Sequence, residues 1–228
     1  MNFVGMDKLS LLDYEDKVSA VLFCKPCNFR CPYCHNGLTV LKSNDEISWE
    51  HVLEYLNTRK GILDAVVFTG GEVTLMPDLK EKIKQVKSLG FLVKVDTNGT
   101  NPEVIKDLLK DNLLYYVAMD IKNSKNKYPL TTDTKINFFD KVYETYQILL
   151  NSGIDFELRT TLVDEFFTSE DIEAIGESFK DTPKMYLQKF VEREGCLKKG
   201  LHSVSEDQAN KFKSILEKYM SKVELRGY

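Results

Sequence analysis

Six short apolar runs alternate with longer helical patterns along this chain of 228 residues, and this alternation constrains the fold more than any other feature. Most of the runs are nearly continuous in apolar residues, which is typical of parallel strands that are covered on both faces. The predicted strands cover residues 18–23, 65–68, 91–95, 115–120, 155–162 and 184–190. We therefore expect a parallel sheet with a helix between successive strands.

Residues that favour helix ends lie between these runs. Serine, threonine and asparagine favour the position before a helix, proline its first turn, and glycine the position after it. In chain order the signals are Ser48; Pro77 with Gly90; Asn101-Pro102; Asn137 with Gly153; Thr168 or Ser169; and the capping box Ser205-x-x-Gln208.

The number of strand–helix units limits the architecture. A closed (β/α)8 barrel needs eight units and about 250 residues. Six units predict an α/β fold in the form of a partial (β/α)6 TIM-like barrel, built as a single domain over residues 1–228 with a lead-in at 1–17. Such barrels place their chemistry at the C-terminal ends of the strands, so residues that directly follow a strand are candidate site residues.

Three cysteines, Cys27, Cys31 and Cys34, follow the first predicted strand in a loop at residues 24–36. A [4Fe–4S] cube has four irons, each normally held by a cysteine thiolate. Three thiolates from one short loop would hold three irons and leave the fourth open to a small molecule. The spacing therefore indicates a reactive iron–sulfur cluster.

Zinc and disulfides are the alternatives for these cysteines. A zinc site usually combines two Cys/His pairs, and the second pair would have to come from His35, His51, His202 or Cys196. His35 adjoins Cys34, which is too close for the usual pairing of zinc ligands. Disulfide frameworks are typical of small secreted domains, whereas 228 residues can bury an ample core. A zinc site stays open as an alternative, and His51 and His202 are expected to face solvent.

Polar residues follow other predicted strands as well. Thr69-Gly70-Gly71-Glu72 follows the second, Asp96-Thr97-Asn98-Gly99 the third and Asp120-Ile121-Lys122 the fourth, while the sixth carries Gln188. Two glycines let a ligand or a neighbouring backbone come close, and a carboxylate can accept hydrogen bonds from an ammonium group. The structural alternatives are a tight turn for the glycines and a surface ion pair for the aspartate and lysine.

Composition limits the partners and the compartment. A net charge of −4 gives no general attraction to nucleic acid or anionic membranes, and no apolar run approaches the roughly 20 residues of a membrane span. Five cysteines, four of them at positions 24–34, suit a reducing compartment and a metal. We expect a cytoplasmic protein in which Cys24 and Cys196 are ordinary thiols.

Taken together, these motifs resemble the radical S-adenosylmethionine (SAM) enzymes, and among them the activating enzymes of glycyl-radical proteins. The likeness is greatest to the activating proteins of anaerobic ribonucleotide reductases. The residues that carry it are Leu-Ser-Leu-Leu-Asp-Tyr at 9–14, Cys-Asn-Phe-Arg-Cys-Pro-Tyr-Cys-His-Asn at 27–36, Met-Asp-Ile-Lys at 119–122 and Leu-Arg-Gly at 225–227.

The resemblance implies a cofactor site with two components. Cys27, Cys31 and Cys34 would bind the [4Fe–4S] cluster, and SAM would bind its fourth iron. The other cofactor-binding residues that it implies are Tyr33 near the adenine; Gly70, Gly71 and Glu72 at the SAM ammonium; Asp96, Asp120 and Lys122 at the ribose and carboxylate; and Gln188 at the sixth strand end.

The activity that the resemblance implies is reductive cleavage of SAM, followed by abstraction of hydrogen from a glycine of a glycyl-radical enzyme. A reduced flavodoxin or ferredoxin would supply the electron. The sequence departs from the family at Val73, where proline is common, at Glu15-Asp16, where Pro-Gly is usual, and at Lys25-Pro26. None of these departures removes a cluster ligand.

The substrate is inferred from the absence of further cysteines. None lies between Cys34 and Gly70, and Cys196 is the only later one, so the sequence shows no auxiliary cluster. A minimal open barrel favours a glycine of a protein partner, and we expect an anaerobic ribonucleotide reductase. The alternatives are a radical SAM enzyme that acts on a small molecule or on another glycyl-radical enzyme, and a non-catalytic iron–sulfur or zinc module.

Overall fold

The computed structural model describes residues 3–42 and 46–228. Its contacts divide the chain into two compact units. The first comprises Met1–Asn28, Thr39–Thr97 and Glu103–Val117, and the second comprises Phe29–Leu38, Asn98–Pro102 and Ala118–Tyr228. The single domain over residues 1–228 stays a prediction.

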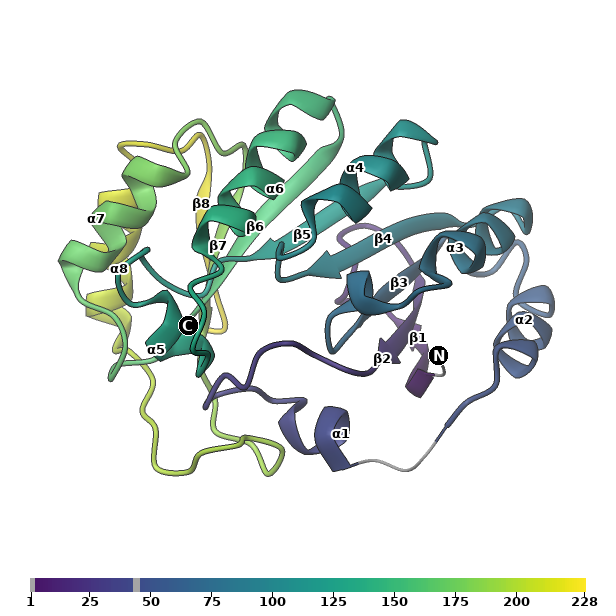
Figure 1. The fold of residues 1–228 in the computed structure, drawn as a ribbon, viewed down its shortest axis with the longest axis horizontal. Coiled ribbons are helices and arrows are strands. Elements are labelled where there is room, and N and C mark those ends of the chain that lie inside the picture. The colour runs from purple at the N-terminus through teal and green to yellow at the C-terminus, as the bar shows by residue number, and fades with distance from the viewer. Residues whose placement is uncertain (1–2, 43–45) are drawn as a thin grey trace. The chain divides into compact units, whose positions relative to one another are not determined.

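The described part of the first unit contains strands that lie side by side in chain order (Figure 1). They are β1 (Phe3–Ser10), β2 (Ser19–Cys24), β3 (Ala65–Gly70) and β4 (Leu92–Thr97), followed by the first residues of β5 (Tyr116–Asp120). β2, β3 and β4 are parallel, as predicted, whereas β1 pairs antiparallel with β2. The sequence analysis missed β1 because its partly exposed residues include a glycine and two charged side chains and form no continuous apolar run.

The helices that connect these strands follow most of the predicted signals. They are α1 (Gly37–Lys42), α2 (Trp49–Asn57), the 3₁₀ helix η1 (Val73–Leu75), α3 (Leu79–Ser88) and α4 (Pro102–Lys110). Ser48 caps α2 through its side chain, as expected. The prediction that Pro77 opens α3 was wrong by two residues, because η1 takes up the chain before it and Asp78 occupies the cap position.

A small cluster of buried residues joins the strands of the first unit. It consists of Tyr14, Val21, Ala65, Val67 and Tyr116, and the half-buried side chains of Phe23 and Leu92 pack against it. Tyr14 lies in the loop between β1 and β2 and contacts the ring of Tyr116, with centroids 5.4 Å apart. The lead-in is therefore part of the core of this unit.

The second unit repeats the strand–helix alternation. Its parallel neighbours are β6 (Asp155–Leu162), β7 (Met185–Lys189) and β8 (Val223–Arg226), and its helices are α5 (Tyr128–Thr132), α6 (Phe139–Ser152), α7 (Ser169–Ser178) and α8 (Glu206–Leu216). β6 has the predicted bounds. Thr168 caps α7 in a reciprocal capping box with Asp171, and Gly153 ends α6 at a φ of +74°.

Parallel strands bring their C-terminal ends to one edge of the sheet within each unit. In the first unit this edge carries Cys24, Gly70 and Thr97. In the second it carries Leu162 and Lys189, and Asp120 ends β5. The polar motifs of the sequence therefore lie at strand ends, as the barrel prediction requires.

Candidate functional site

In the first unit the glycine turn after β3 lies against the start of the cysteine loop. Cys24 at the end of β2 is in register with Gly70 at the end of β3. Beyond this pair, the Gly71 N–H donates to the Cys24 carbonyl at 2.8 Å, and the Glu72 N–H donates to the Pro26 carbonyl at 2.9 Å. The two loops thus continue the pairing of their strands and run together towards Cys27.

Gly70 and Gly71 make this close approach possible. A Cβ on Gly70 would lie 2.6 Å from the backbone nitrogen of Cys24, and one on Gly71 would lie 2.5 Å from the Pro26 carbonyl oxygen. Gly70 also has a φ of +107°, which side-chain-bearing residues rarely adopt. Of the two interpretations left open by the sequence, the approach of a neighbouring backbone accounts for both glycines.

Glu72 is fully buried and its carboxylate is held by neighbouring groups. Its Oε1 accepts hydrogen bonds from the Thr74 N–H at 3.0 Å and from the Thr97 hydroxyl at 2.7 Å. The Thr74 hydroxyl donates to the same oxygen. Glu72 therefore caps η1, and the same hydrogen bonds fix the rotamer of its side chain. A ligand ammonium would meet a carboxylate that is already oriented.

The two cysteines of the first unit differ in burial. Cys24 is fully buried, while Cys27 is half-buried. Burial raises the pKa of the Cys24 thiol to about 12, and the negative charge of Glu72 contributes to the rise. A thiol of that pKa stays protonated near neutral pH, whereas metal ligation needs a thiolate. Cys24 is thus a buried, protonated thiol, and its place outside the ligand set stays a prediction.

Cys31 and Cys34 belong to the second unit, where two successive turns shape their loop. The Cys34 N–H donates to the Cys31 carbonyl at 3.0 Å, and the Gly37 N–H donates to the Cys34 carbonyl at 3.2 Å. Cys31 is buried and Cys34 half-buried, and neither is in a disulfide. Burial raises the pKa of Cys34, and the ammonium of Lys122 opposes that rise.

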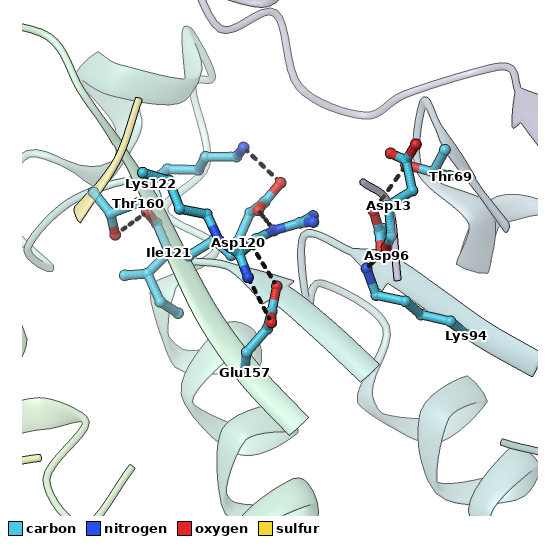
Figure 2. Close-up of polar contacts among 11 residues, drawn as sticks. Asp13, Thr69, Lys94, Asp96, Asp120, Ile121, Lys122, Glu157 and Thr160 are labelled. Atoms are coloured by element: carbon cyan, nitrogen blue, oxygen red, sulfur yellow. Dashed lines mark hydrogen bonds and ion pairs between the residues drawn. The ribbon is translucent and has the colours of Figure 1, made fainter. Parts of the chain in front are cut away.

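Asp120 and Lys122, which are labelled in Figure 2, form a charged network. Arg159 of β6 is its third member. The Lys122 ammonium lies 3.2 Å from Asp120 Oδ2, and Arg159 Nε donates to Asp120 Oδ1 at 2.9 Å. Burial alone would raise the pKa of Asp120, but the two cations lower it to about 2. The structure therefore replaces the interpretation of Asp120 and Lys122 as a solvated surface pair with a largely buried network.

The sequence analysis missed Arg159. Residues 155–162 read Asp-Phe-Glu-Leu-Arg-Thr-Thr-Leu, so Arg159 is one of several polar residues in that strand and the sequence did not single it out. Its side chain is 14% exposed.

Tyr33 lies close to the charged network of Asp120 and Lys122 within the second unit. Its side chain is almost fully buried, and its ring contacts those of Phe166 and Phe190 with centroids 6.0 Å and 6.5 Å apart. Burial raises the pKa of its hydroxyl, and Cys31 adds to the rise. Gln188, half-buried on β7, pairs with Thr161 and Arg226 through the sheet register.

Asp96 lies in a separate network of the first unit (Figure 2). Its Oδ1 is 3.1 Å from the ammonium of Lys94, and its Oδ2 accepts from the Thr69 hydroxyl at 3.2 Å. Lys94 also donates to the carbonyl of Asp13 in the lead-in. These contacts give Asp96 a structural role, and its contact with a cofactor ribose stays a prediction.

The donor set suits an iron–sulfur cluster. Over residues 3–42 and 46–228, no three histidine, cysteine, aspartate or glutamate side chains are grouped to hold a single metal ion. The cysteine loop carries the thiols of Cys27, Cys31 and Cys34, and thiolates are the usual ligands of [4Fe–4S] clusters. The residues present therefore fit the group that the cysteine spacing predicts.

Comparison with known proteins places the chain in a family. A model of the radical SAM superfamily matches residues 21–178. The chain is 34% identical to a protein of Methanocaldococcus jannaschii that is provisionally named a glycyl-radical enzyme activating enzyme, and the alignment covers 97% of this chain and 94% of that one. It is also 29% identical to the pyruvate formate-lyase-activating enzyme of Clostridium pasteurianum, over 73% of this chain and 71% of the relative.

A solved structure has the same fold at low sequence identity. Streptococcus suis SuiB bound to S-adenosylmethionine superposes with a TM-score of 0.68 at 12% identity, over 88% of this chain and 48% of that one. The chain belongs to the radical SAM superfamily. It is an enzyme with the partial-barrel fold and the cofactors of that superfamily, a [4Fe–4S] cluster and SAM, as predicted.

None of the described helices is long and apolar enough to cross a membrane.

Proposed function

We propose that this protein is a radical SAM activating enzyme that generates a glycyl radical on a partner enzyme, and that the partner is an anaerobic ribonucleotide reductase. The observation that carries the activity is the likeness to the M. jannaschii protein, which extends over nearly the whole of both chains. The pyruvate formate-lyase-activating enzyme of C. pasteurianum supports the same activity, since its name states the same reaction class.

Cys27, Cys31 and Cys34 would hold the cluster through their thiolates. When bound, the cluster supplies the electron that splits SAM into methionine and a 5′-deoxyadenosyl radical. The raised pKa of Cys34 means that cluster binding must release a proton from this thiol. Cluster assembly is therefore expected to become easier as the pH rises through neutrality.

Glu72 would orient SAM by accepting a hydrogen bond from the ammonium of its methionine part. Thr74 and Thr97 fix the carboxylate before any ligand arrives, so less side-chain entropy is lost on binding. Gly70 and Gly71 would act indirectly, because they allow the cysteine loop and the Glu72 turn to lie in contact.

The second unit would contribute two cations for the anionic part of the cofactor. Lys122 and Arg159 both contact the carboxylate of Asp120. The buried Tyr33 ring provides an apolar surface for the adenine, and Gln188 a neutral polar group on β7. Asp96 completes this set of proposed cofactor-binding residues.

The choice of partner rests on the resemblance of residues 9–14, 27–36, 119–122 and 225–227 to reductase-activating proteins. Asp13 and Arg226 in these segments make contacts inside their own units. The Ser10 hydroxyl donates to Asp13 at 2.5 Å, and Arg226 is paired with buried Glu157 at 3.2 Å. Asp13 and Arg226 therefore stabilise the fold of their own units, and the choice of partner depends on the sequence resemblance.

The test uses the full chain, reconstituted with iron and sulfide without oxygen, then reduced and mixed with SAM and a candidate reductase. A doublet glycyl-radical signal in electron paramagnetic resonance is expected, and it should disappear when the radical-bearing glycine near the C-terminus of the reductase is changed to alanine. SAM cleavage without a radical on the reductase would overturn this partner and favour a small molecule or another glycyl-radical enzyme. Absence of SAM cleavage would overturn the activity itself.

A further inference from the structure

We infer that the segment after β7, residues 190–198, is a brace that positions the cluster-binding loop, and that Gly195 is its central positioning residue. We call this segment the β7 brace. The inference rests on the proposed ligand set, because the brace acts on the loop that carries Cys31 and Cys34. Every contact that supports it lies within the second unit.

Backbone hydrogen bonds attach the β7 brace on both sides of Cys34. The Lys198 N–H donates to the carbonyl of Pro32 at 2.8 Å, and the Leu38 N–H donates to the carbonyl of Gly195 at 3.2 Å. The two segments are remote in sequence, since Tyr33 and Cys196 are 163 residues apart. Local turns alone therefore do not determine the conformation of the cysteine loop.

Glycine is required where the two backbones meet. A Cβ on Gly195 would lie 2.1 Å from the carbonyl oxygen of His35, a distance that no real Cβ tolerates. The φ of Gly195 lies outside the left-handed region, so close approach and not backbone conformation demands the glycine. On the opposite segment, a Cβ on Gly37 would lie 2.5 Å from the side chain of Leu197.

Side chains of the brace hold the residues on either side of Cys34. The ring of Phe190 stacks on His35 at 5.8 Å and meets the ring of Tyr33 edge-on at 6.5 Å. The buried Cys196 thiol donates to the Tyr33 carbonyl at 3.8 Å and accepts from the Arg193 N–H at 3.4 Å. Neither neighbour of Cys34 can therefore rotate freely.

A second contact holds the loop before Cys31. The Arg30 N–H donates to the carbonyl of Thr132 in α5 at 2.9 Å. The stretch with Cys31 and Cys34 is thus held at both ends by parts of the chain that follow β5 and β7. Holding ligands in place by surrounding groups lowers the ordering cost of metal binding and slows ligand exchange, so the brace should control cluster retention.

The first experiment compares Gly195→Ala with a matched control, Gly5→Ala. A Cβ on Gly5 would meet its nearest atom, in Phe23, at an ordinary 3.6 Å. Both variants are reconstituted without oxygen, and the loss of the cluster to an iron chelator is followed by absorbance. Gly195→Ala should lose its cluster about 10–100-fold faster than wild type, the usual effect of losing a group that supports a metal ligand. Gly5→Ala should match wild type.

Two further readouts separate positioning from general destabilisation. The metal-free Gly195→Ala chain should keep the circular dichroism of wild type. The reduced cluster should show an altered electron paramagnetic resonance spectrum, because Cys34 is displaced. Equal chelation rates and identical spectra in Gly195→Ala and wild type would overturn the brace. If wild type itself bound no cluster, the proposed ligand set would fail first.

A double-variant test covers the case in which Gly195→Ala does not fold. Gly37→Ala should speed cluster loss because its methyl group collides with Leu197, and Leu197→Ala should remove that collision. The double variant Gly37→Ala/Leu197→Ala should therefore hold its cluster longer than Gly37→Ala. Gly37→Ala and Leu197→Ala are also measured separately. If the effects of these two single variants on the rate of cluster loss simply add in the double variant, Leu197 does not press on the cysteine loop. That result would refute the brace.

Discussion

The Thr97 hydroxyl donates a hydrogen bond to the Glu72 carboxylate, with 2.7 Å between Oγ1 and Oε1. Glu72 follows β3 and Thr97 is the last residue of the neighbouring parallel strand β4, and both are buried. The contact links the glycine turn to the Asp-Thr-Asn-Gly segment, two motifs that are separate in the sequence. It also gives Thr97, which the sequence analysis assigned to no site, a role in orienting the proposed SAM ligand.

Replacing Glu72 by glutamine should weaken SAM binding and leave the iron content unchanged. The lost charge-assisted hydrogen bond to the SAM ammonium is worth about 1.5–3 kcal/mol, which is roughly a 10- to 150-fold rise in Kd. Equilibrium dialysis of SAM against the reconstituted variant without oxygen measures this change. An unaltered Kd would mean that the carboxylate serves only as the cap of η1.

Thr97→Val should weaken SAM binding by about tenfold, because the nearly isosteric valine removes a hydrogen bond to a charged group. Thr97→Ser retains the hydroxyl and is the matched control, so its Kd should stay close to that of wild type. Isothermal titration of SAM into both reconstituted variants makes the comparison. If the serine and valine variants bind SAM equally, Thr97 does not orient Glu72 for the cofactor.

Single serine substitutions should divide the cysteines into two groups. Cys27→Ser, Cys31→Ser and Cys34→Ser should each abolish SAM cleavage, because each removes a proposed cluster ligand. Cys24→Ser and Cys196→Ser should retain it, since Cys24 is a protonated buried thiol and serine at position 196 keeps a hydrogen-bond donor. Iron analysis and a SAM-cleavage assay provide the readout. Loss of the cluster in Cys24→Ser together with its retention in Cys27→Ser would contradict the assignment.

The Asp120 network should make stability depend on pH in the acid range. The pKa of Asp120 is lowered from 3.8 to about 2, so its contribution is complete above pH 4 and lost as the pH falls towards 2. Asp120→Asn should therefore lower the free energy of unfolding of the metal-free chain by about 2 kcal/mol at pH 7, and by less at pH 3.

Urea unfolding of wild type and Asp120→Asn at both pH values tests this expectation. Asp140→Asn is the control, because Asp140 is an exposed partner of Lys125 and such surface pairs contribute about 0–1 kcal/mol. If the difference in the free energy of unfolding between wild type and Asp120→Asn is the same at pH 7 and pH 3, the lowered pKa of Asp120 does not contribute to stability.

The buried Lys94–Asp96 pair should contribute to the free energy of unfolding even in the chain without cofactor. Lys94→Met should lower the free energy of unfolding by about 3–5 kcal/mol, since it removes the cation in contact with a buried carboxylate. Lys125→Met, at an exposed ion pair, should change it by less than about 1 kcal/mol. Urea unfolding of the two metal-free variants measures these changes. Equal losses of unfolding free energy in Lys94→Met and Lys125→Met would contradict the structural role of Asp96.

Local sequence signals predicted most of the regular structure. The predicted strand at 155–162 has the bounds of β6, and Ser48 and Thr168 cap α2 and α7. Apolar periodicity and capping depend on neighbours within one or two turns, so they can be read without tertiary structure. β1 and β8 were missed because partly exposed strands without a continuous apolar run take their conformation from the strand beside them.

The sequence by itself determined the spacing of Cys27, Cys31 and Cys34 and the place of the polar motifs at strand ends, because both follow from covalent order and residue type. Only the tertiary structure decided that Arg159 joins Asp120, that Thr97 holds Glu72, and that residues 190–198 lie against the cysteine loop. Each of these contacts joins residues far apart in the chain, and the packing of the parallel strands and their loops brings them together.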